Sequence, residues 1–132
     1  MVYGSADTLA NLLHNQSSDM GLLAFNEEFQ DEGLDFMPFE TRALNPCLLT
    51  NKEANISCFR AGDSRTDKPL GTMVFQTLFL REHNRLALEL KELNPHCEEE
   101  LYQEARKIIE AMIHVGPGTL KAHVSQEPAT ME

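Results

Sequence analysis

The sequence has little positive charge and no long apolar run. Its 11 lysines and arginines are outnumbered by 21 acidic residues, so the net charge is −10 at pH 7. A phosphate-binding surface needs clustered basic side chains, and the basic residues here are scattered. No apolar stretch reaches the roughly 18 to 20 residues of a membrane-spanning helix. The sequence therefore predicts neither a nucleic-acid partner nor a membrane span.

Motifs for several common kinds of site are also absent. There is no GxSxG, P-loop, HExxH or CxxC motif. None of the five histidines shows the spacing of metal ligands, so no metal site is predicted: His14, His83, His96, His114 and His123. The first residues, MVYGSADTLA, lack the basic and apolar regions of a signal peptide, and none is expected in this chain.

What is present suits a mainly α-helical domain. At 132 residues, 42% of them hydrophobic, the chain can bury a modest core. Helical patterns predict helices over 5–14, 72–93 and 98–113. The turn-rich stretch 15–71 is long for an independent small domain, so the chain is not expected to be self-sufficient. The expected fold is two long helices with an irregular, loop-rich N-terminal half.

The segment 72–93 has the strongest helical pattern. Its predicted buried face is a stripe of four apolar residues with a 3.6-residue period: Phe75, Phe79, Leu86 and Leu90. His83 lies on that stripe, where a histidine is more typically a buried, hydrogen-bonded structural residue than a ligand. Arg81 and Arg85 repel one another, which predicts carboxylates or carbonyls from elsewhere in the chain beside them. Arg85 and Glu89 form an i,i+4 pair.

The shorter segments carry weaker signals. In the helix over 5–14, Ser5 or Asp7 is the expected cap, and Leu9, Leu12 and Leu13 share a face. The apolar pieces GLLAF and DFMPF are expected to dock onto the core. The last residues, 115–132, have no period and are rich in small and polar residues, which predicts a disordered tail.

The three cysteines leave two interpretations open. Cys47 and Cys58 bracket a polar loop, and their separation suits a small disulfide-closed loop. The alternative is two unpaired thiols in a cytosolic protein. Glycosylation sequons at Asn15 and Asn55 favour the secretory route. Cys97 has no obvious partner and is expected to be a free thiol.

The segment Gly62-Asp63-Ser64-Arg65 is predicted to be a turn. Asp63 and Ser64 can bond nearby backbone amides there. Arg65 is either a surface charge or an electrostatic stabiliser in a site. Local evidence alone favours the surface charge, and residue chemistry leaves the function open at this point.

Several motifs, taken together and in order, resemble the animal haem peroxidases: MVYGS, GLLAFNEEFQDEG, PCLLTN, CFRAGDSR, TLFLREHNRLALELKELNPH and LYQEARKI. The resemblance runs from Met1 to about His114, which predicts a partial catalytic domain over 1–114 and a divergent tail over 115–132. It implies a mainly α fold that holds haem b. It also implies oxidation of halides, thiocyanate or small organic donors by hydrogen peroxide, a part in the response to oxidative stress, and a secreted or granule-stored protein.

Residue by residue, the resemblance gives Arg65 a catalytic role. Arg65 matches the family's distal arginine, which would contact haem and stabilise negative charge as the peroxide O–O bond breaks. Cys47 and Cys58 match a family disulfide. The position of His83 belongs to the helix framework of the family and is not a haem ligand.

The chain also departs from the family pattern. Lys68 stands at the haem-binding position where the family has a glutamate esterified to haem, and a lysine cannot form that ester. Pro69 stands where one type of member has a methionine bonded to a haem vinyl group, and Cys97 where relatives commonly carry tryptophan. The distal histidine and the calcium loop belong before Met1 in the family, and the iron-binding histidine has no counterpart here.

These departures predict an interior slice of a larger domain, inactive by itself. We expect it to expose apolar side chains, such as those of the stripe through Phe75 and Leu90, to the missing remainder of the domain. The alternative is a non-catalytic helical protein that acts through its exposed helices.

Overall fold

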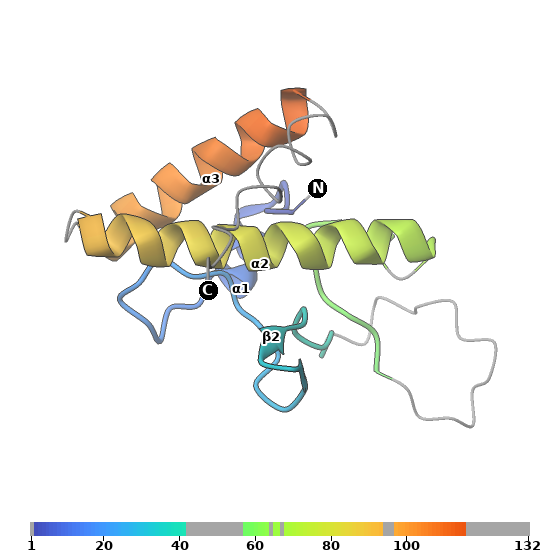
Figure 1. The fold of residues 1–132 in the computed structure, drawn as a ribbon. Coiled ribbons are helices and arrows are strands. Elements are labelled where there is room, and N and C mark those ends of the chain that lie inside the picture. The colour runs from blue at the N-terminus through green and yellow to red at the C-terminus, as the bar shows by residue number, and fades with distance from the viewer. Residues whose placement is uncertain (1, 42–56, 64, 67, 94–96, 116–132) are drawn as a thin grey trace, which may run out of the picture.

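The computed structural model describes residues 2–41, 57–63, 65–66, 68–93 and 97–115. Figure 1 shows a mainly helical arrangement, which confirms the predicted fold class. Its elements are α1 (Asp7–Leu13), β1 (Gln30–Asp31), β2 (Leu34–Asp35), α2 (Leu70–Leu93) and α3 (Glu98–Val115). The strands β1 and β2 pair antiparallel as a short hairpin.

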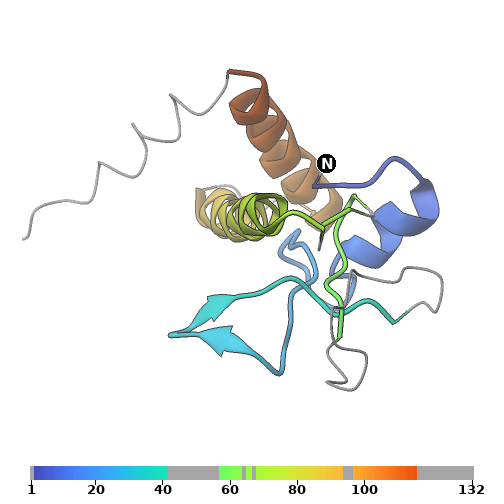
Figure 2. The same ribbon diagram turned by 90° about the vertical axis from the view of Figure 1, so that its right-hand side faces the viewer.

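Helix α2 is the axis on which the other elements are arranged. Helix α3 and the β1–β2 hairpin lie on opposite sides of α2, and α1 lies beside it near the N-terminal segment (Figure 2). Helix α2 begins at Leu70, two residues earlier than predicted, and ends at Leu93, directly before Asn94-Pro95. Helix α3 continues to Val115, so the first residue of the predicted tail is helical. Residues 116–132 lie outside the described residues.

The core lies where the N-terminal loops meet α2 and α3. Buried apolar side chains come from the N-terminal segment, the end of α1, the loops on either side of the hairpin, α2 and α3: Val2, Tyr3, Leu13, Leu22, Leu23, Met37, Leu80, Leu86, Ala87, Leu101, Tyr102, Ala105 and Ile109. The short pieces GLLAF and DFMPF contribute Leu22, Leu23 and Met37. Their predicted docking onto the core is therefore confirmed.

The apolar stripe of α2 does not have one environment along its length. Phe75 is 53% exposed, as expected of a face left for the missing remainder of the domain, whereas Leu86 is buried, contrary to that expectation. Phe79 and Leu90 are half-buried and pack against the core, so they are not the exposed face that we expected. The buried line of α2 is shifted by about one residue and consists of Gln76, Leu80, His83, Asn84, Leu86 and Ala87. Three of these side chains are polar: Gln76, His83 and Asn84. The apolar pattern did not predict the buried face of α2 correctly, because three polar residues of the helix are buried against the loops.

Helix α1 differs from its predicted form at its start. Its N-cap is Ala6, and no side chain caps the helix, so neither Ser5 nor Asp7 has the expected role. Leu13 is buried and Leu9 packs against the core, but Leu12 is 42% exposed. A helix of only two turns presents one narrow apolar face, which leaves Leu12 at its edge.

Candidate functional site

The polar side chains in the middle of α2 fasten the N-terminal loops to the helix. Arg81 Nε donates to the Asp35 backbone carbonyl at 2.7 Å. Asn84 accepts the Leu23 N–H at 2.8 Å and donates to the Leu23 carbonyl at 3.2 Å. Arg85 instead pairs with Glu82 and Glu89 of its own helix. The prediction that partners come from elsewhere in the chain thus holds for Arg81 and fails for Arg85.

His83 is a buried structural residue, as predicted. Its Nε2 lies 3.0 Å from the Gly21 carbonyl, which can only accept, so Nε2 carries a hydrogen. In the neutral ring Nδ1 is then an acceptor, and the Tyr3 hydroxyl donates to it at 2.8 Å. Burial lowers the pKa of His83 to about 4, which keeps the ring neutral at pH 7. Both nitrogens are occupied, so His83 is not positioned to bind a metal.

Gly21 lets the loop approach α3 closely. Its φ is +68°, and a Cβ at this position would lie 2.6 Å from the Tyr102 backbone nitrogen and 2.9 Å from Leu101 Cβ. A side chain is excluded both by this contact and by the left-handed backbone. The carbonyl that His83 binds is held in place by this close approach.

Two tyrosines complete the cluster around His83. The Tyr102 ring stacks on His14 at 4.1 Å between centroids and meets the edge of His83 at 5.1 Å. His14 Nε2 also pairs with the Glu98 carboxylate. Burial raises the pKa of Tyr102 to about 12, and burial also raises the pKa of Tyr3. This cluster joins four segments, and sequence reasoning found only His83 in it.

Arg65 lies in an exposed turn just before α2. Its side chain is 72% exposed and forms a two-pronged pair with Asp63, with Nε at 3.0 Å and Nη2 at 2.8 Å from the carboxylate oxygens. The Arg65 N–H also donates to Asp63 at 2.9 Å, which confirms the predicted turn. These hydrogen bonds hold the pKa of Asp63 well below its usual range. Lys68 is exposed nearby, and its N–H donates to the Arg65 carbonyl at 3.0 Å.

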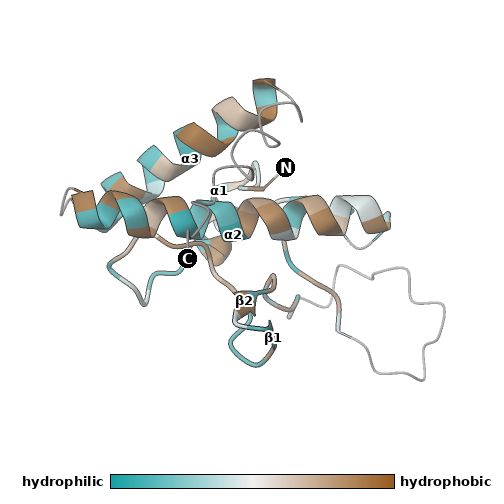
Figure 3. Ribbon diagram, viewed as in Figure 1, coloured by the Kyte–Doolittle hydropathy of each residue, from teal (hydrophilic) through white to brown (hydrophobic). Residues whose placement is uncertain are grey.

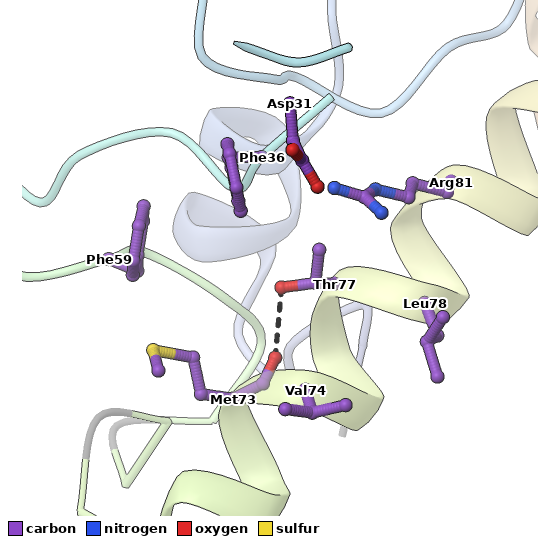
Figure 4. A pocket seen from close by; sticks show the side chains of 8 residues that line it. All are labelled: Asp31, Phe36, Phe59, Met73, Val74, Thr77, Leu78 and Arg81. Carbon is purple, nitrogen blue, oxygen red and sulfur yellow. Dashed lines mark hydrogen bonds between the residues drawn. The ribbon is translucent and has the colours of Figure 1, made fainter. Parts of the chain in front are cut away.

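The larger pocket described lies between α2 and the loops that carry Phe36 and Phe59. Its volume is about 240 Å³. Figure 4 shows the eight side chains that line it: Asp31, Phe36, Phe59, Met73, Val74, Thr77, Leu78 and Arg81. Asp31 and Arg81 point toward one another at one end, and the Arg81 guanidinium lies 5.3 Å from the centre of the Phe36 ring. The rest of the lining is largely apolar.

The residues matched to haem contacts do not line the larger pocket. The pocket is smaller than the roughly 300–1,000 Å³ of typical cofactor sites, and no histidine lines it. Neither Arg65 nor Lys68, the residues matched to haem contacts, lines a described pocket. Within these residues, no group of three His, Cys, Asp or Glu side chains is placed to hold a metal ion.

The other predicted sites are only partly covered by the structure. Cys47 and Asn55 lie outside the described residues, so the disulfide with Cys58 and the second glycosylation site stay predictions. Asn15 lies in a turn where its side-chain oxygen accepts from the Ser17 N–H at 3.2 Å and hydroxyl at 2.7 Å. Cys97 is an exposed free thiol, as predicted.

No helix in the described part of the chain is long and apolar enough to cross a membrane.

Comparison with known proteins assigns a family to these features. Residues 1–115 match the animal haem peroxidase family. Myeloperoxidase from Homo sapiens is 53% identical over 116 residues, and eosinophil peroxidase from Mus musculus is 52% identical over 116 residues. Lactoperoxidase from Mesocricetus auratus is 51% identical over the same length. Each match covers 87% of this chain but only 16% of the relative. This chain therefore belongs to the animal haem peroxidase family.

Proposed function

We propose that the chain forms part of a haem peroxidase catalytic domain. In the whole domain, hydrogen peroxide would oxidise halide, thiocyanate or small organic donors, in a secreted or granule-stored protein that responds to oxidative stress. The observation that carries this proposal is the match of residues 1–115 to the family, together with identities above 50% to three peroxidases. The chain spans 16% of the length of these relatives, so the proposed activity is that of a longer protein.

Arg65 is the residue proposed to contact haem and peroxide. Its guanidinium is oriented by Asp63, whose carboxylate accepts hydrogen bonds from Nε and Nη2. Among the described residues, none forms a hydrogen bond with Nη1 of Arg65. Nη1 is therefore the donor that this geometry leaves for a ligand. A fixed cation of this kind stabilises negative charge that develops as a peroxide bond breaks. The neighbouring Lys68 adds a second positive charge and cannot form a haem ester.

We also propose that the isolated chain does not turn over peroxide. A haem peroxidase needs an axial ligand for iron and a general acid–base group. His83 has both nitrogens bonded, and His14 is paired with Glu98. Neither of these histidines, nor Arg65, lines either of the two pockets found among the described residues.

A haem titration tests this proposal. Residues 1–132 are mixed with haemin, and the Soret band and peroxide-dependent oxidation of a dye are followed, with Arg65→Ala as the comparison. We expect no stoichiometric complex and no turnover above free haemin. A stoichiometric complex whose turnover is lost in Arg65→Ala would overturn the proposed inactivity and support the role of Arg65.

The apolar face of α2 is the proposed contact with the rest of the domain. Leu70, Val74 and Leu78 recur every four residues on α2 and are 72%, 48% and 46% exposed. Val74 and Leu78 also line the larger pocket, so this face and the pocket are continuous. Monomeric proteins rarely leave such surfaces bare, and the match covers only 16% of human myeloperoxidase, so most of the relative's chain is available to cover this face. The competing function is a helical protein that binds an unrelated partner through the same face.

Co-expression separates these two functions. A tagged chain is produced with the remaining part of human myeloperoxidase, and the amount that co-purifies is measured. We expect Leu78→Asp to reduce co-purification at least tenfold, and Leu12→Asp, at a similarly exposed leucine of α1, to leave it unchanged. Equal capture of both variants would show that this face is not the contact.

We further infer a disulfide between Cys47 and Cys58, and glycans on Asn15 and Asn55. The disulfide would close a loop of about eleven residues and stabilise the fold by roughly 2–3 kcal/mol on the chain-entropy model. A peptide map of secreted protein tests both features. Two free thiols at these positions would contradict the disulfide, and unmodified asparagines would contradict the glycans.

A further inference from the structure

A second, much smaller cavity lies between α2 and the segment that leads to Arg65. Its volume is about 10 Å³. Most of its lining is apolar and belongs to the core, including Leu13, Met37 and Leu80. Two polar side chains also line it, Arg60 from the loop segment and Gln76 from α2.

Each of these polar side chains has a buried atom without a hydrogen-bond partner among the described residues. The atoms are Arg60 Nε and Gln76 Oε1. Their chemistry is complementary, because Nε–H is a donor and the amide oxygen is an acceptor. Gln76 is only 6% exposed, so bulk water does not reach its oxygen. Buried polar groups in folded proteins are almost always satisfied by protein or by ordered water.

The cavity is just large enough for one water molecule, because about 10–15 Å³ of space open to the centre of a water-sized probe is the least that a single water needs. A buried water also needs at least two polar partners, and Arg60 and Gln76 supply two in an otherwise apolar lining. We propose that one internal water molecule occupies this cavity, accepts the Arg60 Nε–H and donates to Gln76 Oε1.

This bridge would tie the loop before the Gly62–Arg65 turn to α2. The Arg60 backbone is already held, since its N–H donates to the Pro38 carbonyl at 2.7 Å. The water adds a side-chain tie to a helix that begins ten residues later at Leu70. The inference does not depend on the proposed role of Arg65, because it concerns only how the segment is held.

Solution NMR on the 132-residue chain tests the bridge directly. The Arg60 Nε–H signal is assigned, and cross-relaxation with water is measured. We expect a cross-peak of the sign that marks a water bound for longer than nanoseconds. An assigned Arg60 signal without such a cross-peak would overturn the proposal, as would a direct bond between Arg60 and Gln76 in an experimental structure.

A double-mutant cycle gives an independent measurement. Arg60→Leu and Gln76→Leu each leave one polar atom unsatisfied, so each should raise the unfolding equilibrium constant about 10- to 100-fold. The double variant removes both polar groups, and its increase should be at least tenfold smaller than the product of the single effects. Gln103→Leu, on the surface of α3, is the matched control and should change the constant less than about threefold. If the unfolding constant of the double variant rises by the full product of the two single effects, the bridge is contradicted. If a variant does not fold, the NMR measurement on the unmodified chain still decides.

Discussion

The first and middle parts of α2 differ in which side chains are buried: apolar side chains are exposed in the first part, and polar side chains are buried in the middle. In the first part, Leu70, Val74 and Leu78 are exposed. In the middle, His83 and Asn84 are buried, with His83 fully inaccessible. Figure 3 shows this change along α2, from hydrophobic residues to hydrophilic ones. The middle of α2 is covered by loops that supply hydrogen-bond partners, whereas the described residues leave the apolar side chains of its first part only partly covered.

Burial along this helix therefore depends on which segments pack against it, rather than on the polarity of its own side chains. A buried polar group is tolerated when its hydrogen bonds are complete. His83 and Asn84 meet this condition through Tyr3, Gly21 and Leu23. An exposed leucine stripe is unfavourable for a monomer but useful for an interface.

The largest expected effect is at Gly21, where the covering loop is pressed against α3. Gly21→Ala should destabilise the fold by about 4 kcal/mol, because the new Cβ would meet the Tyr102 backbone and the φ of +68° is strained for alanine. Chemical denaturation measures this change. Gly71→Ala, with open space around its Cβ position, is the control and should be neutral or slightly stabilising. Equal effects at the two glycines would contradict the close approach.

The second effect is a loss of stability in acid that depends on His83. Its pKa of about 4 in the fold lies below the ordinary value of 6.5, so unfolding takes up a proton between these values. The neutral His83 ring makes its full contribution to the free energy of unfolding above pH 6.5. This free energy should fall by about 3 kcal/mol as the pH drops to about 4. Denaturation curves across this range measure it.

Two histidine variants isolate that contribution. His83→Gln should flatten the dependence of stability on pH between 4 and 6.5, although it also lowers stability overall. His114→Gln, at an exposed position of α3, should leave the dependence unchanged. An unaltered pH profile in His83→Gln would show that other groups cause the acid effect.

A third, somewhat smaller effect is expected at Asn84. Asn84→Ala leaves the Leu23 N–H and carbonyl without their partner, which should destabilise the fold by about 2–3 kcal/mol. Thermal unfolding measures the change. Asn11→Ala, at an exposed position of α1, should change stability by less than about 0.5 kcal/mol. If the two variants unfold alike, the loop is not held by Asn84.

The smallest effect is expected on the exposed face of α2. Leu78→Ala should reduce the stability of the isolated chain by less than about 1 kcal/mol, because half of the side chain is already in water. Leu80→Ala, two residues along and only 5% exposed, should cost about 2–5 kcal/mol. The ratio of these two losses, measured by denaturation, reports how completely the first part of α2 is covered in solution. Equal losses would mean that Leu78 is buried in the isolated chain.

Much of this structure could be predicted from local pattern. Helical periodicity located α2 and α3 to within about two residues, and the Asn-Pro pair located the end of α2. The turn at Arg65 followed from its Asp and Gly. The partners of the buried polar residues could not be predicted, because Tyr3, Gly21 and Leu23 are 61 to 80 positions away from α2's polar residues.

The family, the helical class and the positions of the long helices could all be read from the amino-acid sequence, because they depend on motif order and short-range periodicity. The buried face of α2, the orientation of Arg65 and the place of His83 as a neutral link between loops became known from the fold. Each of these depends on hydrogen bonds and packing between segments far apart in the chain. Arg81, His83 and Asn84, in the middle of α2, show this most clearly, because their hydrogen bonds hold the loops in place.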